Sequence, residues 1–340
     1  MPVATPEQYA RMLDGALAGG YAFPAVNVTS SQVLNGILHG LAQARSDGIV
    51  QVTVGGAEYL GGGDALAGAR AFAAMARELA APLDVLVAVH TDHAPPATVD
   101  SFLRPLIADS AARRERHEPP LFGSHMFDGS TLPLADNLER SRELLDVAAA
   151  AGLILEVEVG VVGGEEDGVR GPEGAQDRLY TTTADLLRTA DVLGTGEHGR
   201  YLLAATFGNV HGVYAPGHVQ LRPEILGDGQ AALAAQHPGA RFAYVFHGSS
   251  GSAAEDIRAA IAAGVVKINL DTDAQYAFTR AIADHVLSNY DGVLKVDGGL
   301  GRKAAYDPRS WGAKAEAALA DHIAAAAALF GSAGRGLLQA

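Results

Sequence analysis

Eight short apolar segments, alternating with stretches of helical spacing, restrict the fold of this chain more than any other feature. They lie at residues 21–28, 48–54, 83–93, 121–128, 153–160, 201–210, 241–248 and 265–273. Each is rich in apolar and β-branched residues, as a buried strand is. Strands that alternate with helices form parallel sheets with helical crossovers. Eight such units predict a closed (β/α)8 TIM barrel, an α/β fold whose chemistry lies at the carboxyl ends of the strands.

The 340 residues are expected to form a single domain, because no internal repeat and no linker-like segment interrupts the pattern. An open, doubly wound sheet would have fewer strands and a phosphate-binding motif after the first one, and the sequence has neither. Residues 160–180 are glycine-rich and acidic and are predicted to form a mobile surface loop. A C-terminal helical extension is predicted from about residue 309.

Charge and composition exclude several kinds of partner. The formal net charge is −14, which argues against nucleic acid or an anionic membrane. No apolar run reaches the roughly 18 residues that a membrane span needs, and the first residues do not resemble a signal peptide. The chain has no cysteine, which excludes disulfides and thiolate metal sites. We therefore expect a cytoplasmic protein. A small anionic substrate is compatible with this charge, because backbone amides can hold a phosphate.

Three histidines each stand at the polar end of a predicted strand: His93, His211 and His247. A single histidine in such a place is usually a structural residue, but three from separate strands at one barrel face favour a metal site. Three neutral imidazoles leave a zinc ion its full charge and an open coordination position. We therefore predict a catalytic zinc site.

Carboxylates accompany these histidines. Asp92 adjoins His93 and is the natural acid/base candidate, with orientation of a ligating imidazole as the alternative role. Asp128 and Glu158 end two further strands, where they either hold a second or alternative metal position or orient the histidines. His90 lies on the same side of its strand as Asp92 and is expected to support the metal ligands.

Glycine- and hydroxyl-rich turns follow the last two predicted strands. The sequence HGSSGS occupies residues 247–252, and NLDTD occupies residues 269–273. A phosphate site formed by the loops after strands seven and eight recurs in this barrel. Since most Gly/Ser runs are plain turns, each turn alone is a weak signal. Together they predict a phosphate-binding site.

Six motifs in order along the chain resemble those of class II fructose-bisphosphate aldolases. They are HTDH, GGEEDG, GNVHGVY, FHGSSGS, NLDTD and YDPR, and FPAVN near the start adds to the similarity. The resemblance implies reversible aldol cleavage of fructose 1,6-bisphosphate to dihydroxyacetone phosphate and glyceraldehyde 3-phosphate, with zinc stabilising the enediolate. It implies a place in glycolysis and gluconeogenesis and a homo-oligomer, a dimer or tetramer. An aldolase for a related ketose bisphosphate, such as tagatose 1,6-bisphosphate, is the alternative.

The resemblance also implies residue roles. His93, His211 and His247 match the zinc ligands, Asp92 matches the residue that exchanges a proton with the C4 hydroxyl, and Glu166 matches the base acting on C3 of dihydroxyacetone phosphate. Asp128 and Glu158 match an alternative position for a divalent metal. A monovalent cation, Na⁺ or K⁺, lies beside the dihydroxyacetone-phosphate end in the family. The matching substrate-binding residues are Asn27, Thr53, Gly212, Gly248, Ser249, Ser250, Asn269, Leu270, Asp271, Thr272, Lys303 and Arg309, of which the last two match groups for the other phosphate, in some members from a neighbouring subunit.

The sequence departs from the family pattern at three positions. Thr53 replaces a usual Ser, Val28 a common Cys, and Ser249 a common Gly. None of these changes removes a catalytic group. They bear on the fine positioning of substrate and leave the reaction class unchanged.

Three rival functions remain possible from the residues alone. A Schiff-base aldolase would use Lys267, whose parity with Asn269 points it into the barrel, but it would leave the three histidines unexplained. The simpler reading of Lys267 is a buried ion pair with a nearby carboxylate. A metal-dependent hydrolase would carry a His-x-His pair on the first strand, which is absent. A silent phosphosugar-binding protein would not need the histidine triad or Asp92.

Overall fold

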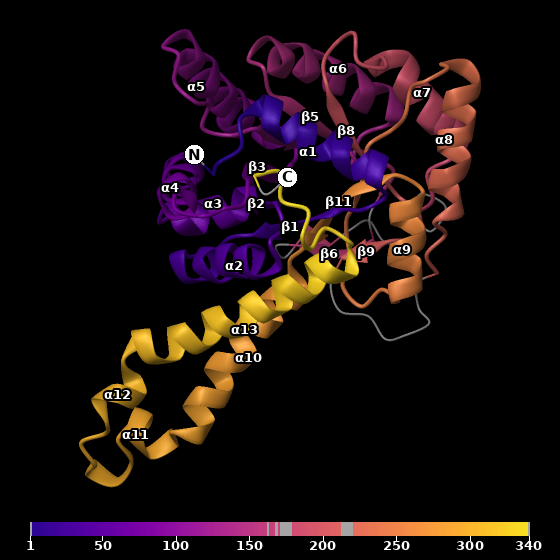
Figure 1. Ribbon diagram of the computed structural model, residues 1–340. Helices are drawn as coiled ribbons and strands as arrows, with labels where there is room; N and C mark the ends of the chain where they lie inside the picture. Colours follow the sequence, from indigo (N-terminus) through magenta and orange to yellow (C-terminus); the bar gives the residue numbers. More distant parts are fainter. Residues whose placement is uncertain (1, 162, 167–168, 171–178, 212–219, 339–340) are drawn as a thin grey trace.

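The computed structural model is a closed barrel of eight parallel strands surrounded by helices, with a helical arm that projects from one side (Figure 1). It describes residues 2–161, 163–166, 169–170, 179–211 and 220–338. For residues 163–166, 169–170 and 211 only the backbone is described. Among the described residues, no helix is both long and apolar enough to cross a membrane.

Each barrel strand overlaps one of the eight predicted segments, so the predicted TIM barrel is confirmed. Around the barrel the strands follow the order β1-β11-β10-β8-β5-β4-β3-β2, and all neighbouring pairs are parallel. The strands are β1 (Phe23–Asn27), β2 (Gly48–Val52), β3 (Val87–Ala94), β4 (Ser124–Phe127), β5 (Ile154–Val159), β8 (Tyr201–Ala205), β10 (Tyr244–Phe246) and β11 (Val265–Leu270).

Helices cover the outside of the barrel, and side-chain caps fix where several of them begin. Ser30, Thr53, Asp64 and Thr182 each accept a hydrogen bond from a backbone N–H of the first turn, which satisfies a donor that the helix leaves unpaired. The outer helices are α1 (Pro6–Gly19), α2 (Ser31–Ala44), α3 (Val54–Leu60), α4 (Ala65–Ala80), α5 (Arg104–Glu115), α6 (Leu134–Ala150), α7 (Thr183–Leu193), α8 (Glu224–Gln236) and α9 (Ala254–Ala262), with the short turns η1 (Pro96–Thr98) and η2 (Val99–Leu103) before α5.

The barrel interior changes from apolar to polar along the strands. Alternate residues of a strand face the same side, so Ile49 is followed inward by Gln51, and Ile154 by Glu156. The residues nearer the amino ends of the strands form an apolar cluster that α1 covers: Phe23, Ala25, Ile49, Ala88, Ile154, Leu202 and Val245. The polar residues lie beyond this cluster, toward the carboxyl ends. The barrel interior is therefore apolar near the amino ends of the strands and polar near their carboxyl ends.

The projecting arm begins with α10, immediately after the last barrel strand. Its two long helices, α10 (Thr272–Ser288) and α13 (Pro308–Leu329), pack together and extend away from the barrel. The end of the arm contains α11 (Tyr290–Leu294), η4 (Val296–Gly298) and α12 (Lys303–Tyr306). The base of α13 packs on α2, which ties the arm to the barrel wall.

A small second sheet lies within and beside the segment expected to be a loop. It contains β6 (Gly163–Glu166), β7 (Val169–Arg170) and β9 (Val210–His211), in the order β7-β6-β9. Gly164 pairs with His211 in parallel, so the strand that carries Glu166 runs beside the strand that carries His211. Whether this region moves during turnover stays a prediction.

Candidate active site at the carboxyl end of the barrel

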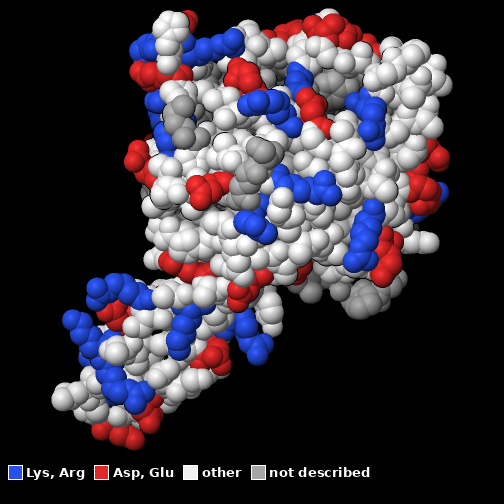
Figure 2. Space-filling model, in the orientation of Figure 1, with Lys and Arg blue, Asp and Glu red and all other residues white. Residues whose placement is uncertain are grey.

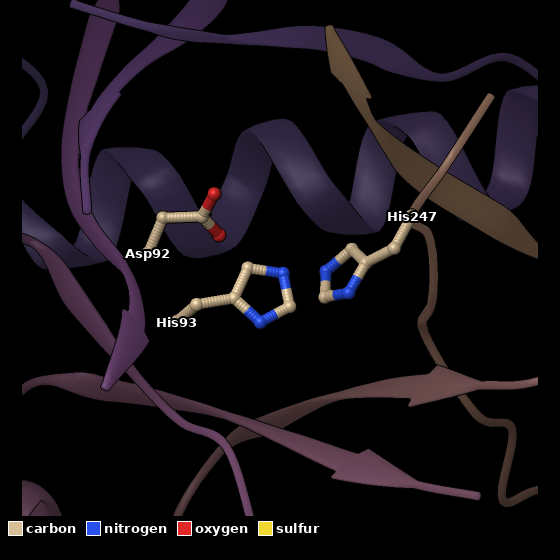
Figure 3. Close-up of side chains that lie close together, drawn as sticks. All are labelled: Asp92, His93 and His247. Carbon is tan, nitrogen blue, oxygen red and sulfur yellow. The ribbon is translucent and has the colours of Figure 1, made fainter. Parts of the chain in front are cut away.

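Three predicted site residues meet at the carboxyl end of the barrel. One ligand atom from each of Asp92, His93 and His247 lies within 4.8 Å of the other two, and Figure 3 shows the side chains converging. The imidazole centroids of His93 and His247 are 4.6 Å apart. Side chains 154 residues apart in the chain therefore form one group, as expected for strand ends of one barrel.

The backbone of His93 is responsible for bringing two adjacent residues to one site. Strand alternation would send Asp92 and His93 to opposite faces. His93 has a φ of 31°, in the region that non-glycine residues seldom occupy, and the register between β3 and β4 shifts between Thr91 and Ala94. This irregularity turns the His93 imidazole toward His247. Backbone strain of this kind is typical of functional sites.

Two carboxylates flank His93. Its Nδ1 lies 3.0 Å from an oxygen of Asp128 and 3.5 Å from an oxygen of Glu158. Asp128 also accepts a hydrogen bond from the backbone N–H of Ser130, which fixes the carboxylate just beyond β4. Asp128 and Glu158 therefore both lie beside the His93 imidazole, and their role at a second metal position stays a prediction.

Asp92 is fully buried and is held by two amide side chains. The Nε2 of Gln51 donates to one carboxylate oxygen at 2.8 Å, and the Nδ2 of Asn269 lies 3.2 and 3.3 Å from the two oxygens. Gln51 also donates to the Oδ1 of Asn27 at 2.6 Å, so two predicted substrate-binding residues belong to the same network. These donors suit an ionised carboxylate.

A buried ion pair lies directly below the histidines. The Nζ of Lys267 is 2.8 Å from Glu156, and the Nε2 of His247 donates to the same carboxylate at 2.8 Å. His90 also points its Nε2 toward Glu156, at 3.4 Å, while its Nδ1 lies 2.6 Å from the hydroxyl of Ser124. Lys267 is therefore ion-paired with a buried carboxylate, as the alternative to a Schiff-base role predicts, and His90 lies beside the same carboxylate.

The ion pair keeps Glu156 charged. Burial alone would raise the pKa of Glu156, but Lys267, His90 and His247 outweigh burial and hold the pKa well below its usual range. Burial lowers the pKa of His247, yet its hydrogen bonds to Glu156 and Glu158 prevail and raise that pKa to about 9. A metal ion that binds His247 must displace this proton.

The other carboxylates differ from one another. Burial would raise the pKa of Asp92, but His93, Lys267 and His247 keep that pKa below the usual value. The pKa of Glu158 is raised, first by burial and then by the charge of Asp128. The surroundings therefore favour the ionised form of Asp92, whereas burial and Asp128 make Glu158 easier to protonate than an exposed glutamate.

Several predicted residues lie at the edge of the described structure. The backbone of His211 lies in β9 and that of Glu166 in β6, and their side chains are outside the described set, as is all of Gly212. The surroundings of β9 are described: the Asn209 side chain donates to the carbonyl oxygen of His247 at 2.9 Å. The start of β9 is therefore joined to the strand end that carries a proposed ligand.

The turn after β10 requires glycine at residue 248. Gly248 has a φ of 62°, and a Cβ there would lie 2.5 Å from the carbonyl oxygen of Val210. The next residue, Ser249, is buried and donates its hydroxyl to the carbonyl oxygen of Asn269 at 2.8 Å. The turn after β10 is thus joined to the end of β11, and a phosphate site shared by the turns after these two strands stays a prediction.

Three of the remaining substrate-binding candidates, Thr53, Asp271 and Thr272, lie at the beginnings of helices. Thr53 caps α3 by accepting a hydrogen bond from the N–H of Gly56 at 2.9 Å. Leu270 ends β11, Asp271 is the residue before α10, and Thr272 is the first residue of that helix. Ser250 lies in the turn after β10. Helix beginnings present backbone N–H groups and favour anions.

Two predicted residues lie far from this cluster within one chain. Lys303 begins α12, and Arg309 lies in the first turn of α13, near the outer end of the arm (Figure 1). The Arg309 side chain is 86% exposed and pairs with Asp307. Figure 2 shows other Lys and Arg side chains spread over the same arm. The barrel of the same chain does not bring these two groups to its own site.

Sequence reasoning missed Glu156, Gln51 and Asn209. Glu156 shares the strand parity of Glu158, so the sequence LEVE contained a signal for two inward carboxylates. Gln51 sits two residues after Ile49 on an otherwise apolar strand, which also indicated an inward polar group. No sequence pattern indicated the hydrogen bond between Asn209 and His247.

The residues present suit a divalent metal. Imidazole nitrogens and carboxylate oxygens converge, and a donor set of this type binds zinc and similar ions. Three groups among the described residues have ligand atoms close enough to share one ion: Asp92, His93 and His247; His90, Asp92 and Glu156; and His93, Asp128 and Glu158.

Comparison with known proteins gives consistent matches over nearly the whole chain. The family model described as fructose-bisphosphate aldolase class-II matches residues 7–335. A fructose-bisphosphate aldolase of Streptomyces galbus is 56% identical over 338 residues, covering 98% of this chain and 99% of that protein. One of Mycobacterium leprae is 54% identical, covering 95% of each. The crystal structure of fructose-bisphosphate aldolase from Campylobacter jejuni has a TM-score of 0.86 at 32% identity and covers 98% of this chain and 97% of that one.

Proposed function

The chain belongs to the class II fructose-bisphosphate aldolase family, and we propose that it cleaves fructose 1,6-bisphosphate reversibly to dihydroxyacetone phosphate and glyceraldehyde 3-phosphate. It is an aldehyde-lyase. The observation that carries this function is the convergence of Asp92, His93 and His247 at the carboxyl end of the barrel, in a chain that matches this family over its length. The reaction belongs to glycolysis and gluconeogenesis, and we place it in the cytoplasm.

His93, His211 and His247 are proposed to hold a catalytic zinc ion. When bound, the ion would supply Lewis-acid stabilisation of the negative charge that develops on substrate oxygens. Asp128 and Glu158, beside His93, would hold a second or alternative divalent metal. Glu156 accepts the Nε2 proton of His247, which leaves Nδ1 of that imidazole as the ligating atom.

Asp92 is proposed to exchange a proton with the C4 hydroxyl of the substrate. The support is its full burial, the amide donors from Gln51 and Asn269, and its place beside the metal ligands. A carboxylate held in this way is ionised and can accept the hydroxyl proton as the C3–C4 bond breaks. Glu166 is proposed to return a proton to C3. Its strand runs beside that of His211, which supports this assignment.

The linked turns after β10 and β11 are proposed to bind the dihydroxyacetone-phosphate end. Gly248, Ser249 and the start of α10 supply backbone N–H groups and hydroxyls, and Asn27, Thr53, Gly212, Ser250 and residues 269–272 complete the set. Such groups bind a phosphate without a large positive charge. A monovalent cation, Na⁺ or K⁺, beside this phosphate would offset the acidic surroundings.

Lys303 and Arg309 are proposed to bind the second phosphate in a neighbouring copy of the chain. The arm carries both away from their own barrel, and it also exposes large apolar side chains: Tyr276, Leu287, Tyr290, Leu294 and Leu300. Exposed apolar groups on a projecting element favour contact with another protein surface. A homo-oligomer, a dimer or tetramer, would cover them and complete each site.

Mixing two impaired variants tests this exchange. Asp92→Ala and Arg309→Ala chains, refolded or exchanged together, form hybrids in which one site has both Asp92 and the partner's Arg309. We expect the mixture at low substrate concentration to be several-fold more active than the average of the separate variants. A mixture no more active than that average would place Arg309 in its own subunit's site, or outside the reaction.

Substrate preference tests the reaction itself. Tagatose 1,6-bisphosphate differs from fructose 1,6-bisphosphate at one stereocentre. We expect kcat/KM for the fructose compound to exceed that for the tagatose compound by at least about tenfold, because Asp92 and the bound metal address one configuration at C4. The reverse preference would assign the alternative reaction.

A further inference from the structure

Lys267 is the one lysine inside the barrel among the described residues, and no step of the proposed reaction uses it. Its side chain is fully buried on β11. An ammonium group removed from water is costly unless several acceptors surround it. Its Nζ has them: Glu156 at 2.8 Å and the Oδ1 of Asn269 at 2.8 Å.

The first contact, with Glu156, connects Lys267 to His247, a proposed metal ligand. Glu156 places one oxygen 3.1 Å from Lys267, and the same oxygen lies 2.8 Å from the Nε2 of His247. A carboxylate can only accept here, so His247 donates from Nε2. Its Nδ1 lies 3.6 Å from the same Glu158 oxygen that is 3.5 Å from Nδ1 of His93. Lys267 keeps the Glu156 carboxylate charged and fixed.

The second contact, with Asn269, connects Lys267 to Asp92, the proposed acid/base residue. The Oδ1 of Asn269 accepts from Lys267, so the amide must present its Nδ2 on the other side. That Nδ2 lies 3.2 Å from Asp92. The ammonium and the Asp92 carboxylate therefore favour the same orientation of the Asn269 amide, and loss of Lys267 would leave only the longer contact with Asp92 to hold it.

We propose that Lys267 is a positioning residue that fixes both His247, through Glu156, and Asp92, through Asn269. This inference rests on the proposed function, since it assigns Lys267 to the same metal and acid/base groups. It differs from a Schiff-base role, because the amine is engaged by two acceptors in the barrel centre and acts through its neighbours.

Zinc binding tests the first contact without any assay of the reaction. The metal-free full-length chain is titrated with zinc against a chromogenic chelator, for the wild type, Lys267→Met and Leu202→Met. Leu202 is a buried residue of the apolar cluster, so its exchange for Met controls for altered packing. We expect Lys267→Met to bind zinc about 10- to 100-fold more weakly, as loss of support for a ligating histidine does. Leu202→Met should match the wild type.

A double variant separates the two contacts. Glu156→Gln removes the carboxylate that needs a counter-charge, while its amide oxygen can still accept from His247. In Lys267→Met/Glu156→Gln we expect zinc affinity to return to within about threefold of the wild type. Turnover at saturating zinc should stay about tenfold low with KM little changed, because Asn269 still lacks the ammonium. A purely structural lysine would not produce this division between metal binding and turnover.

Unchanged zinc affinity in Lys267→Met overturns the proposal, as does normal turnover in the double variant. If Lys267→Met does not fold by circular dichroism, the charge-balanced double variant carries the test alone. Failure of the proposed function is a separate result: the wild type would not cleave fructose 1,6-bisphosphate with any metal, whereas the zinc titration would still decide the role of Lys267.

Discussion

The barrel interior and the projecting arm distribute charge and apolar surface in opposite ways. Inside the barrel, Asp92, Glu156 and Lys267 are completely buried. Lys267 donates hydrogen bonds to Glu156 and Asn269, and Asn269 donates to Asp92. On the arm, Leu287 is 73% exposed and Leu300 is 90% exposed. Burying a charge costs free energy, and an apolar core that only stabilised the fold would avoid that cost. Large apolar side chains exposed on a helix pair are typical of a surface that contacts another protein. This contrast supports the proposals that the barrel binds a charged ligand and that the arm contacts a second chain.

The strongest test of this contrast removes a proposed metal ligand. His93→Ala should lower turnover by roughly 10³-fold or more, because charge on the substrate oxygens loses its stabilisation. Metal content measured by atomic emission should fall, while the oligomer measured by light scattering is unchanged. His39→Ala, an exposed histidine on α2, is the matched control and should behave as wild type. Full metal content in His93→Ala would remove His93 from the ligand set.

Asp92→Ala should have the next largest effect. We expect turnover to drop by about 10²-fold or more, because the C4 hydroxyl loses its proton acceptor. Metal content should remain that of the wild type, which distinguishes an acid/base role from a role in orienting a ligand. Equal turnover in the variant and the wild type would rule out the assignment.

Buried histidines in the barrel wall predict a loss of stability in acid. Burial lowers the pKa of His90 and of His125 to about 3. Both pKa values lie below the pKa of about 6.5 that a histidine has in the unfolded chain, so the unfolded chain binds more protons than the folded one as the pH falls. The free energy of unfolding therefore decreases from about pH 6.5 down toward pH 3. Between pH 7 and pH 5 each of these histidines should lower the free energy of unfolding by about 2 kcal/mol.

Urea unfolding of the wild type and of His125→Gln at pH 7 and pH 5 tests this acid sensitivity. Gln does not titrate, so the variant should lose about 2 kcal/mol less than the wild type on acidification. Identical losses would mean that His125 does not contribute to the acid sensitivity of the barrel.

Changes on the arm should affect assembly and leave the barrel chemistry intact. Leu287→Asp places a charge on the exposed face of α10 and should shift the oligomer toward smaller species in light scattering. If a neighbouring chain supplies Arg309 as proposed, KM for fructose 1,6-bisphosphate should rise by about tenfold when that contact is lost, an effect of about 1.4 kcal/mol. Leu79→Asp, on α4 and outside the arm, is the control. An unchanged oligomer would place the contact on another face.

The fold was predictable because its signal repeats. Eight apolar segments with helices between them leave few alternatives to a parallel barrel, and each segment overlaps one barrel strand. The grouping of Asp92, His93 and His247 followed from the same rule, since carboxyl ends of barrel strands lie together.

Other features were out of reach for physical reasons. The positive φ of His93 depends on the register shift between β3 and β4, which no local pattern encodes. Lys267 contacts Glu156 on β5 and Asn269 two residues further along its own strand, β11. Which of the several inward polar groups it contacts depends on the register of the barrel. The arm continues directly from the last strand, so the expected extension from about residue 309 accounts for only its second long helix.

The most direct test of the account is cleavage of fructose 1,6-bisphosphate before chelation, after EDTA, and after zinc is restored. Since the carboxyl end of the barrel assembles histidines and carboxylates and engages its only described inward lysine in an ion pair, we expect activity to disappear with EDTA and return with zinc. Full activity in a chain shown by atomic emission to contain no metal would contradict the account and assign the chemistry to Lys267 instead.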